Sequence, residues 1–128
     1  IGETRGYPPK IGDREISCLL HADDVVIMDL TPIGLQHRLT ALDLFANDHF
    51  LKINVSKSKI LVFDRRRLQP EKNNSWSLAG GKLEKVQSYH YLGKIFGRKG
   101  TDKEHIKHCA SKALTQVTLC LDFIRTVA

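Results

Sequence analysis

The sequence is poor in cysteine, in aromatic side chains and in long hydrophobic runs. Its three cysteines, Cys18, Cys109 and Cys120, form no CxxC pair. An odd number of cysteines without such spacing argues against a disulfide framework, so we expect reduced thiols and an intracellular protein. No apolar run approaches the length of a membrane-spanning helix, and we therefore expect no membrane partner.

The chain also lacks an initiating methionine and a secretory signal pattern. It starts at Ile1, so we expect the sequence to begin inside a longer reading frame. With 128 residues, of which 41% are hydrophobic and 27% charged, it has the size and composition of one modest globular domain.

Charge is unevenly distributed along the chain. Residues 1–50 contain four Lys/Arg and eight Asp/Glu, whereas residues 51–128 contain sixteen and six, so the net charges are −4 and +10. Carboxylates can hold metal cations and basic groups can hold a polyanion, so the pattern is compatible with nucleic-acid binding. A solvated basic surface is the alternative.

Two helices are expected. Thr31 is a suitable N-cap before Pro32, and apolar residues recur at helical spacing until about Phe50. Thr101 and Glu104 have the spacing of a capping box, and an apolar stripe from Ile106 to Ile124 follows.

Short strands are expected around these helices. Residues 14–20 and 25–30 would form a hairpin with the polar tip His21-Ala22-Asp23-Asp24, and residues 64–74 an exposed loop. The other strands are expected at 51–55, 58–63, 76–79, 82–86 and 89–96, with a glycine turn at Gly80-Gly81. The predicted fold class is α+β: antiparallel hairpins with one helix packed across them, then a terminal helix. We also expect an exposed sheet edge.

The pair Asp23-Asp24 is the principal candidate for chemistry. Adjacent carboxylates repel each other, and a divalent cation removes that repulsion. Mg²⁺ prefers oxygen ligands and takes few of them from protein, leaving positions for water and substrate phosphates. Two such ions can activate a primer hydroxyl and stabilise leaving pyrophosphate. The alternative is a solvated turn, in which aspartate is common, but the flanking strands are strongly apolar.

Three ordered blocks carry a family resemblance. They are Leu19-Leu20-His21-Ala22-Asp23-Asp24-Val25-Val26, then Leu51-Lys52-Ile53-Asn54-Val55-Ser56-Lys57-Ser58-Lys59, then Tyr89-His90-Tyr91-Leu92-Gly93. Together they resemble reverse transcriptases of non-LTR (LINE-type) retrotransposons, over roughly residues 14–125. The resemblance implies an RNA-directed DNA polymerase fragment, with a partial palm at 1–96 and a linker and the start of the thumb helix at 97–128.

The resemblance also implies site residues, cofactors and partners. Asp23 and Asp24 correspond to metal ligands, for Mg²⁺ or Mn²⁺ in the complete parent enzyme, and Lys57 to a lysine near the incoming nucleotide, with Lys59 as the alternative. Primer and template contacts correspond to His21, Tyr91, Leu92, Gly93, Lys94, Arg98, Lys99, Lys103 and Lys107. Expected partners are an RNA template, a DNA primer, deoxynucleotide triphosphates and the missing upstream fingers and palm, in the nucleus and cytoplasm.

Two departures from the family pattern limit this expectation. His21 stands where the family usually has tyrosine, and the first catalytic aspartate of the family has no counterpart in this sequence. Glu3, Asp13 and Glu15 are the candidate substitutes, but none lies in an apolar strand context. We therefore expect no DNA synthesis by this chain alone, and a catalytically inactive remnant that binds nucleic acid non-specifically remains the alternative function.

Overall fold

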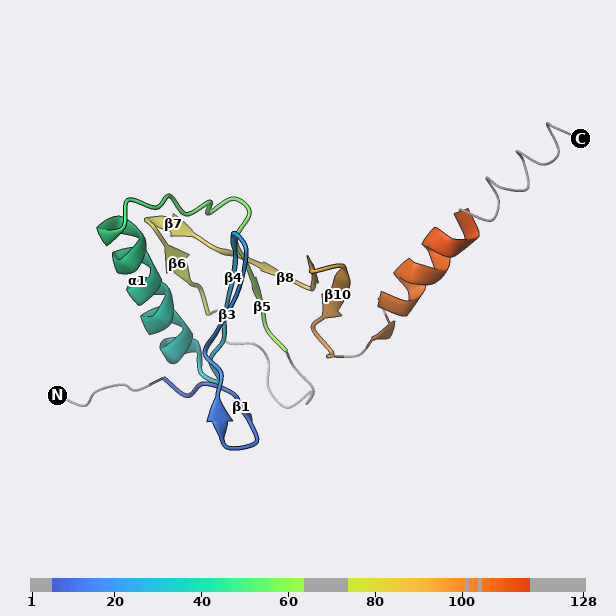
Figure 1. Cartoon of the computed structure of the whole chain (residues 1–128), viewed down its shortest axis with the longest axis horizontal. Coiled ribbons are helices and arrows are strands. Elements are labelled where there is room, and N and C mark those ends of the chain that lie inside the picture. Colours follow the sequence, from blue (N-terminus) through green and yellow to red (C-terminus); the bar gives the residue numbers. More distant parts are fainter. Residues whose placement is uncertain (1–5, 64–73, 101, 104, 116–128) are drawn as a thin grey trace, which may run out of the picture. The chain divides into compact units, whose positions relative to one another are not determined.

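A computed structural model describes residues 6–63, 74–100, 102–103 and 105–115, and its elements follow one another as shown in Figure 1. The chain divides into two compact units, each built from separate stretches of sequence. The first comprises Ile1–Ser58 with Glu71–Leu83, and the second Lys59–Pro70 with Glu84–Ala128. The expected division at residue 97 falls inside the second unit and stays a prediction.

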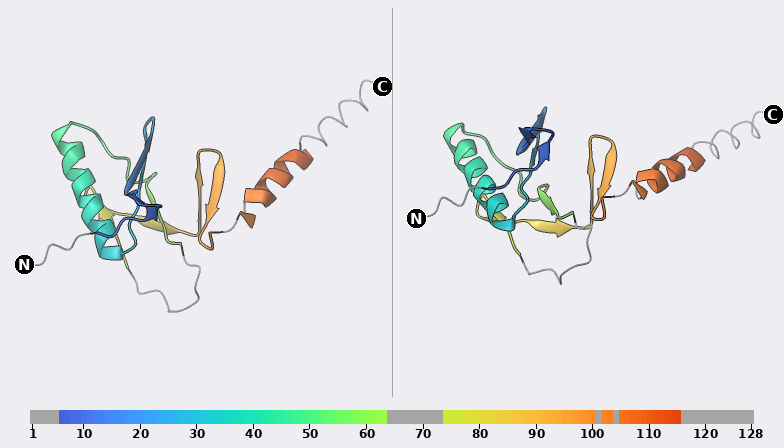
Figure 2. Two further views of the ribbon diagram at one scale, coloured as in Figure 1. Left: turned by 60° about the horizontal axis from the view of Figure 1, so that its bottom comes forward. Right: turned by 90° about the horizontal axis from the view of Figure 1, so that it is seen from below.

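Two antiparallel hairpins open the first unit. Strands β1 (Lys10–Ile11) and β2 (Arg14–Glu15) form the first, and β3 (Cys18–His21) and β4 (Asp24–Ile27) form the second. Figure 2 shows β3 and β4 as a two-stranded ribbon. The expected hairpin around the aspartates is thus confirmed. The strand expected at 14–20 is divided into two, because the Ile16 amide bonds to Pro9 beside β1, whereas the Ser17 carbonyl accepts from Met28 beside β4.

Helix α1 (Pro32–Asp48) begins where the sequence predicts. The Thr31 hydroxyl accepts a hydrogen bond from the Gly34 amide at 3.1 Å, and Pro32 occupies the first helical turn. Backbone amides in the first turn of a helix have no hydrogen-bond partner inside the helix. Proline, which has no amide hydrogen, can therefore stand there without the loss of a hydrogen bond.

The same unit packs α1 against a small hairpin of β6 (Ser77–Leu78) and β7 (Gly81–Lys82). The Gln36 amide pairs with the backbone of Ser77 through two hydrogen bonds of 3.0 Å, one donated and one accepted, as a neighbouring strand would. Trp76 is only 5% exposed, and its indole nitrogen donates to the Pro32 carbonyl at 3.0 Å. Trp76 thus fills the space between the start of α1 and the β6–β7 hairpin. Leu39, Ala46, Leu78 and Leu83 complete the buried apolar set of this unit.

The second unit holds one parallel and one antiparallel pair. Strand β5 (Lys59–Leu61) pairs in parallel with β8 (Glu84–Val86), and β9 (Ser88–Tyr91) pairs antiparallel with β10 (Lys94–Gly97). A terminal helix follows, described over residue 103 and residues 105–115. The expected capping residues Thr101 and Glu104, and the apolar stripe from Val117 on, lie outside the described residues.

The α+β class with antiparallel hairpins and helices is confirmed, but three expected strands are wrong. Residues 51–55 form a loop, because Asn54 and its neighbours bond locally instead of across a sheet. Residues 82–86 divide between β7 and the parallel pair with β5. Residues 89–96 are not one strand but a hairpin, because Leu92-Gly93 forms a turn in which both residues have positive φ. The loop expected at 64–74 lies almost wholly outside the described residues.

Candidate functional site

The aspartate pair lies at a two-residue turn and not at a four-residue tip. His21 and Asp24 face each other as the last pair of the β3–β4 ladder, so only Ala22 and Asp23 lie in the turn. Asp23 therefore occupies the apex, and Asp24 is the first residue of β4 with His21 directly across from it. Residues paired in this way lie within about 5 Å of each other.

The turn places a residue with a Cβ where glycine is preferred. Ala22 has φ of +49°, and in the neighbouring β1–β2 hairpin Gly12, with φ of +59°, holds the same position before Asp13. Of the four turn residues Gly12, Asp13, Ala22 and Asp23, only Gly12 and Ala22 have positive φ, so the two turns share this feature. Ala22 is thus held in a backbone conformation that costs an L-residue about 1 kcal/mol. Such residues are found at functional sites more often than elsewhere.

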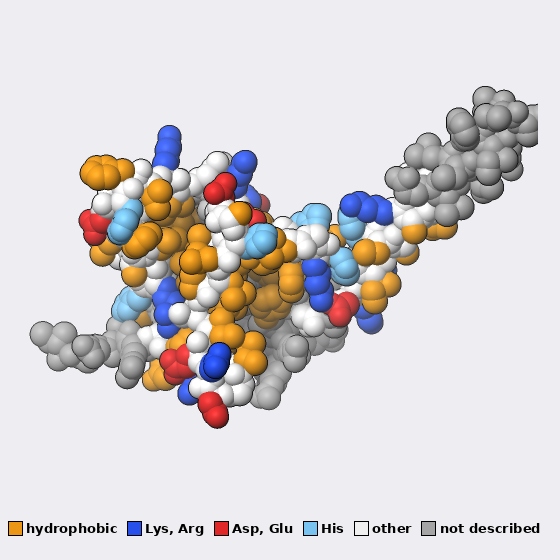
Figure 3. All heavy atoms as spheres, in the orientation of Figure 1, with side chains coloured by type: hydrophobic (Ala, Val, Ile, Leu, Met, Phe, Trp, Pro, Cys, Tyr) orange, Lys and Arg blue, Asp and Glu red, His pale blue; other side chains and the backbone are white. Residues whose placement is uncertain are grey.

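The strands that carry the aspartates are exposed in this chain. Cys18, Leu19, Leu20 and Val25 are all exposed, and Leu20 reaches 75%. Figure 3 shows hydrophobic side chains at many places on the visible surface. The apolar flanks of the aspartate pair are therefore exposed in the chain by itself. The expected exposed sheet edge is found, because β3 and β4 pair with each other and with no further strand among the described residues.

The two carboxylates suit part of a divalent-cation site. They are adjacent, exposed and acceptor-only, and Mg²⁺ commonly takes one or two protein carboxylates with water and phosphate completing its shell. Among the described residues, no cluster of three or more His, Cys, Asp or Glu side chains is placed to hold a metal. Asp23 and Asp24 would supply only two ligands of such a site, and their role as metal ligands stays a prediction.

Lys57 lies in a compact turn after α1. The side-chain oxygen of Asn54 accepts hydrogen bonds from the Lys57 amide at 3.2 Å and from the Ser56 hydroxyl at 2.7 Å. Asn54 thus holds this turn together through its side chain. The Lys57 side chain is exposed, whereas Lys59, the alternative candidate, forms an ion pair with Glu84 in the second unit. Of the two lysines, Lys57 is the one available to an outside phosphate.

Tyr91, Leu92, Gly93 and Lys94 form the tip of the β9–β10 hairpin in the second unit. Leu92 and Gly93 have φ of +48° and +76°, so both central residues meet the requirement of a type I′ turn. No atom lies within 4 Å of the place where a Cβ on Gly93 would stand, and its φ is one that favours glycine.

The expected phosphate-binding cations differ in their surroundings. Lys94 pairs with Asp102 at 2.8 Å and lies 5.5 Å from the centre of the Phe96 ring. This hydrogen bond and the charge of Lys94 lower the pKa of Asp102. Lys99, Lys103 and Lys107 are exposed, and Arg98 is partly buried with interactions of its own. The site residues are thus divided: Asp23, Asp24, His21 and Lys57 belong to the first unit and the remainder to the second.

Sequence reasoning missed Asp29, which organises the first unit beside β4. Its carboxylate accepts hydrogen bonds from the amide and hydroxyl of Thr31, both at 2.9 Å, from the Tyr7 amide at 3.2 Å, and from Arg38 at 2.9 Å. A Cβ on either Gly6 or Gly34 would collide with this carboxylate. The available signal was an aspartate two residues before the Thr-Pro helix start, with Arg38 two turns into the helix.

Comparison with protein-family models, curated proteins and solved structures finds no match to this chain. None of the helices in the described part of the chain combines the length and hydrophobicity needed to cross a bilayer.

Proposed function

We propose that the chain is a fragment of an RNA-directed DNA polymerase, the reverse transcriptase of a non-LTR retrotransposon. In this assignment the first ninety or so residues are the later part of the palm, and the terminal helix is the start of the thumb. The observation that carries the proposal is the β3–β4 hairpin, which presents two adjacent carboxylates at a turn with a strained first residue. The Asn54-supported lysine turn and the Tyr91-Leu92-Gly93 tip add support, because they follow in the family order.

Each residue has a role in the parent enzyme under this proposal. Asp23 binds a catalytic Mg²⁺ or Mn²⁺, and Asp24 is the second carboxylate of the motif. Lys57 neutralises charge on the incoming triphosphate, since its ammonium is a compact donor on a flexible stem. The exposed lysines of the second unit contact the phosphates of template and primer, which provides affinity without sequence choice.

A catalytically inactive remnant is the second candidate function. It is favoured by His21, which stands across from Asp24 where the family has tyrosine, and by the exposure of the β3 and β4 side chains. Such a remnant would keep the basic surface and bind nucleic acid without polymerising.

Metal binding at the hairpin is tested with Mn²⁺ and amide NMR of the full chain. Mn²⁺ should broaden the amide signals of Ala22 and Val25 in the wild type, and Asp23→Asn should remove most of this effect. Asp13→Asn is the matched control, because Asp13 holds the same turn position in β1–β2 without an adjacent aspartate. Equal broadening in wild type and Asp23→Asn would contradict the proposed metal role.

Primer extension and nucleic-acid binding test the two candidate functions. Primer extension on an RNA template should give no product with this chain alone, and extension that Asp23→Ala abolishes would show that the chain is a complete enzyme. Nucleic-acid binding should weaken steeply with salt, by a slope of about one per phosphate contact on logarithmic axes. Replacing Lys103 and Lys107 with Gln should lower that slope by roughly two. Binding that ignores salt would count against both functions.

A further inference from the structure

His105, on the terminal helix, accepts a backbone hydrogen bond from the β9–β10 hairpin of the second unit. The Ile95 amide donates to Nδ1 of His105 at 3.2 Å, and Nε2 of the same ring lies 3.6 Å from the Cys109 sulfur. An imidazole nitrogen can accept a hydrogen bond only when it carries no proton. The contact therefore requires His105 to be neutral, with its proton on Nε2 facing Cys109.

A second histidine pair lies at the same junction. The ring centres of His108, on the helix, and His90, on β9, lie 5.8 Å apart with an interplanar angle of 65°. Nε2 of His108 is buried and has no hydrogen-bond partner among the described residues. A proton on that nitrogen would place a buried charge without a partner, which is unfavourable.

The segments that carry these rings are mostly basic. Strand β10 contributes Lys94, the segment after it contributes Arg98 and Lys99, and the helix contributes Lys103 and Lys107. Asp102 is the described carboxylate that interacts with His105, but it is already paired with Lys94 at 2.8 Å. Protons added to His90, His105 and His108 would thus enter a region with more cations than anions.

We propose that the junction between the terminal helix and the β9–β10 hairpin is a pH-sensitive contact, which acidification opens by protonating His105. Protonation replaces the acceptor at Nδ1 with a second donor, so the Ile95 amide loses its partner and two N–H groups oppose each other. Protonation of His90 and His108 adds repulsion across the same junction. The contact is therefore present while Nδ1 of His105 carries no proton and is lost when the ring gains a second proton. This inference does not depend on polymerase activity or on nucleic-acid binding.

Amide hydrogen exchange and ring-nitrogen NMR of the full chain test the proposal. Between about pH 7.5 and about pH 5, the protection factor of the Ile95 amide should fall by roughly fivefold or more, the factor expected for one lost hydrogen bond. The fall should coincide with protonation of His105 Nδ1, seen in its nitrogen shift. The Trp76 indole N–H, which bonds Pro32 in the first unit, should keep its protection.

His105→Asn is the decisive variant. The asparagine side-chain oxygen can accept from the Ile95 amide near the position of Nδ1, but it does not titrate, so Ile95 should stay protected at both pH values. His49→Asn is the matched control: its Nδ1 contacts the Phe45 carbonyl on α1 at 2.9 Å, and the pH response of Ile95 should remain.

Three outcomes would overturn the proposal. In the first, Ile95 protection does not change with pH in the wild type. In the second, Ile95 opens at a pH where His105 Nδ1 is still unprotonated, which remains measurable even if the variant fails to form the contact. In the third, the Trp76 indole loses protection together with Ile95, which would indicate unfolding of the whole chain.

Discussion

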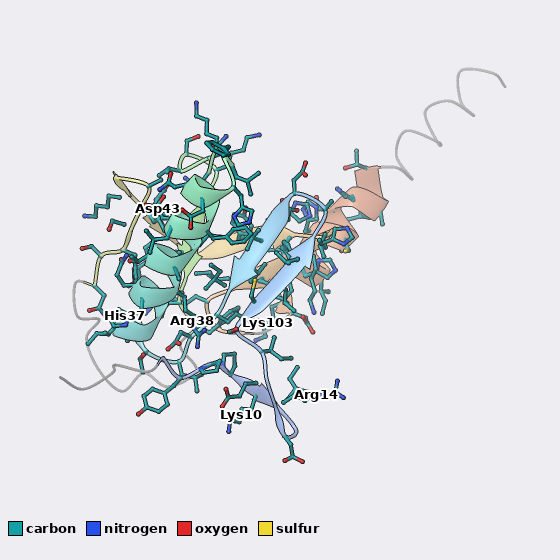
Figure 4. All side chains as sticks on the ribbon, turned by 60° about the vertical axis from the view of Figure 1, so that its left-hand side comes forward. Lys10, Arg14, His37, Arg38, Asp43 and Lys103 are labelled. Atoms are coloured by element: carbon teal, nitrogen blue, oxygen red, sulfur yellow. The ribbon has the colours of Figure 1, made fainter. Side chains whose placement is uncertain are left out.

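Nε of Arg38 lies 2.9 Å from Oδ2 of Asp29, whose side chain is completely buried. Figure 4 labels Arg38 toward the beginning of α1. Through Asp29, this arginine is tied to the Tyr7 amide and to the helix cap at Thr31. One carboxylate thus joins the N-terminal segment, the chain after β4 and α1.

Replacing this carboxylate should destabilise the first unit. Asp29→Asn keeps the shape of the side chain but removes its negative charge, with which Arg38 is paired, and replaces one acceptor oxygen with a donor. We expect a loss of about 2–4 kcal/mol in the free energy of unfolding. Chemical denaturation followed by Trp76 fluorescence measures the loss. Asp48→Asn, at an exposed position at the end of α1, should change stability by less than about 0.5 kcal/mol. Equal effects of the two substitutions would contradict the role of Asp29.

The same carboxylate makes stability depend on pH in acid. Burial raises the pKa of Asp29, but hydrogen bonds from Thr31, Arg38 and Tyr7 outweigh it, so the pKa lies below its ordinary value. The stabilisation is therefore complete above the unfolded value of about 4 and is lost as the pH falls through the lower folded value. Thermal unfolding of wild type and Asp29→Asn should differ at neutral pH and converge in strong acid. A stability difference that persists unchanged below both pKa values would refute this assignment.

The end of α1 contains a residue in an unfavourable conformation. Phe50 has φ of +56° and is 98% exposed, while its amide bonds to Asn47 and the Leu51 amide bonds to Ala46 at 2.8 Å. These two bonds define a Schellman motif, in which glycine is usual at this position. Phe50→Gly should raise the free energy of unfolding by about 1 kcal/mol.

His49→Gly is the control for that change. His49 has φ of −104°, so glycine there relieves no strain and should leave stability unchanged or lower it. Loss of stability in Phe50→Gly would mean that the exposed phenylalanine ring makes a contact that compensates for its backbone angle.

The β1–β2 and β3–β4 hairpins allow a pair of reciprocal substitutions at their turns. Ala22→Gly should stabilise the β3–β4 hairpin, and Gly12→Ala should destabilise β1–β2, each by about 1 kcal/mol, because both positions have positive φ. Amide exchange in each hairpin measures the effect locally. If Ala22→Gly leaves exchange unchanged while Gly12→Ala increases it, the alanine is not strained in solution.

Local signals in the sequence were sufficient for the features that depend on one residue type. Thr31 and Pro32 predict the helix start, and the apolar runs around the aspartates predict the β3–β4 hairpin, because capping and strand pairing there involve near neighbours. The β9–β10 turn was missed because Leu92 gave no turn signal and Gly93 was interpreted as part of a strand.

Long-range partners could not be predicted in the same way. Asp29 is buried by Tyr7 and Arg38, which lie 22 and 9 residues away, and nothing local distinguishes it from an exposed aspartate. Strands β5 and β8 pair in parallel although Lys59 and Glu84, which face each other, are 25 residues apart in the sequence. The hydrophobic pattern of these strands does not indicate which strand each one pairs with. The roles of Asp23, Asp24 and Lys57 rest on the resemblance and stay predictions.

The parallel pair also decides how the chain can be cut and in what order it can fold. Because β5 and β8 belong to the second unit while the β6–β7 hairpin between them belongs to the first, neither unit is a continuous segment. No single truncation therefore releases one unit intact. A nick between β5 and β6 would leave the two stretches of each unit on different polypeptides. Closing the long loop between β5 and β8 costs entropy that no local contact repays, so this ladder should form late, after α1 and the hairpins.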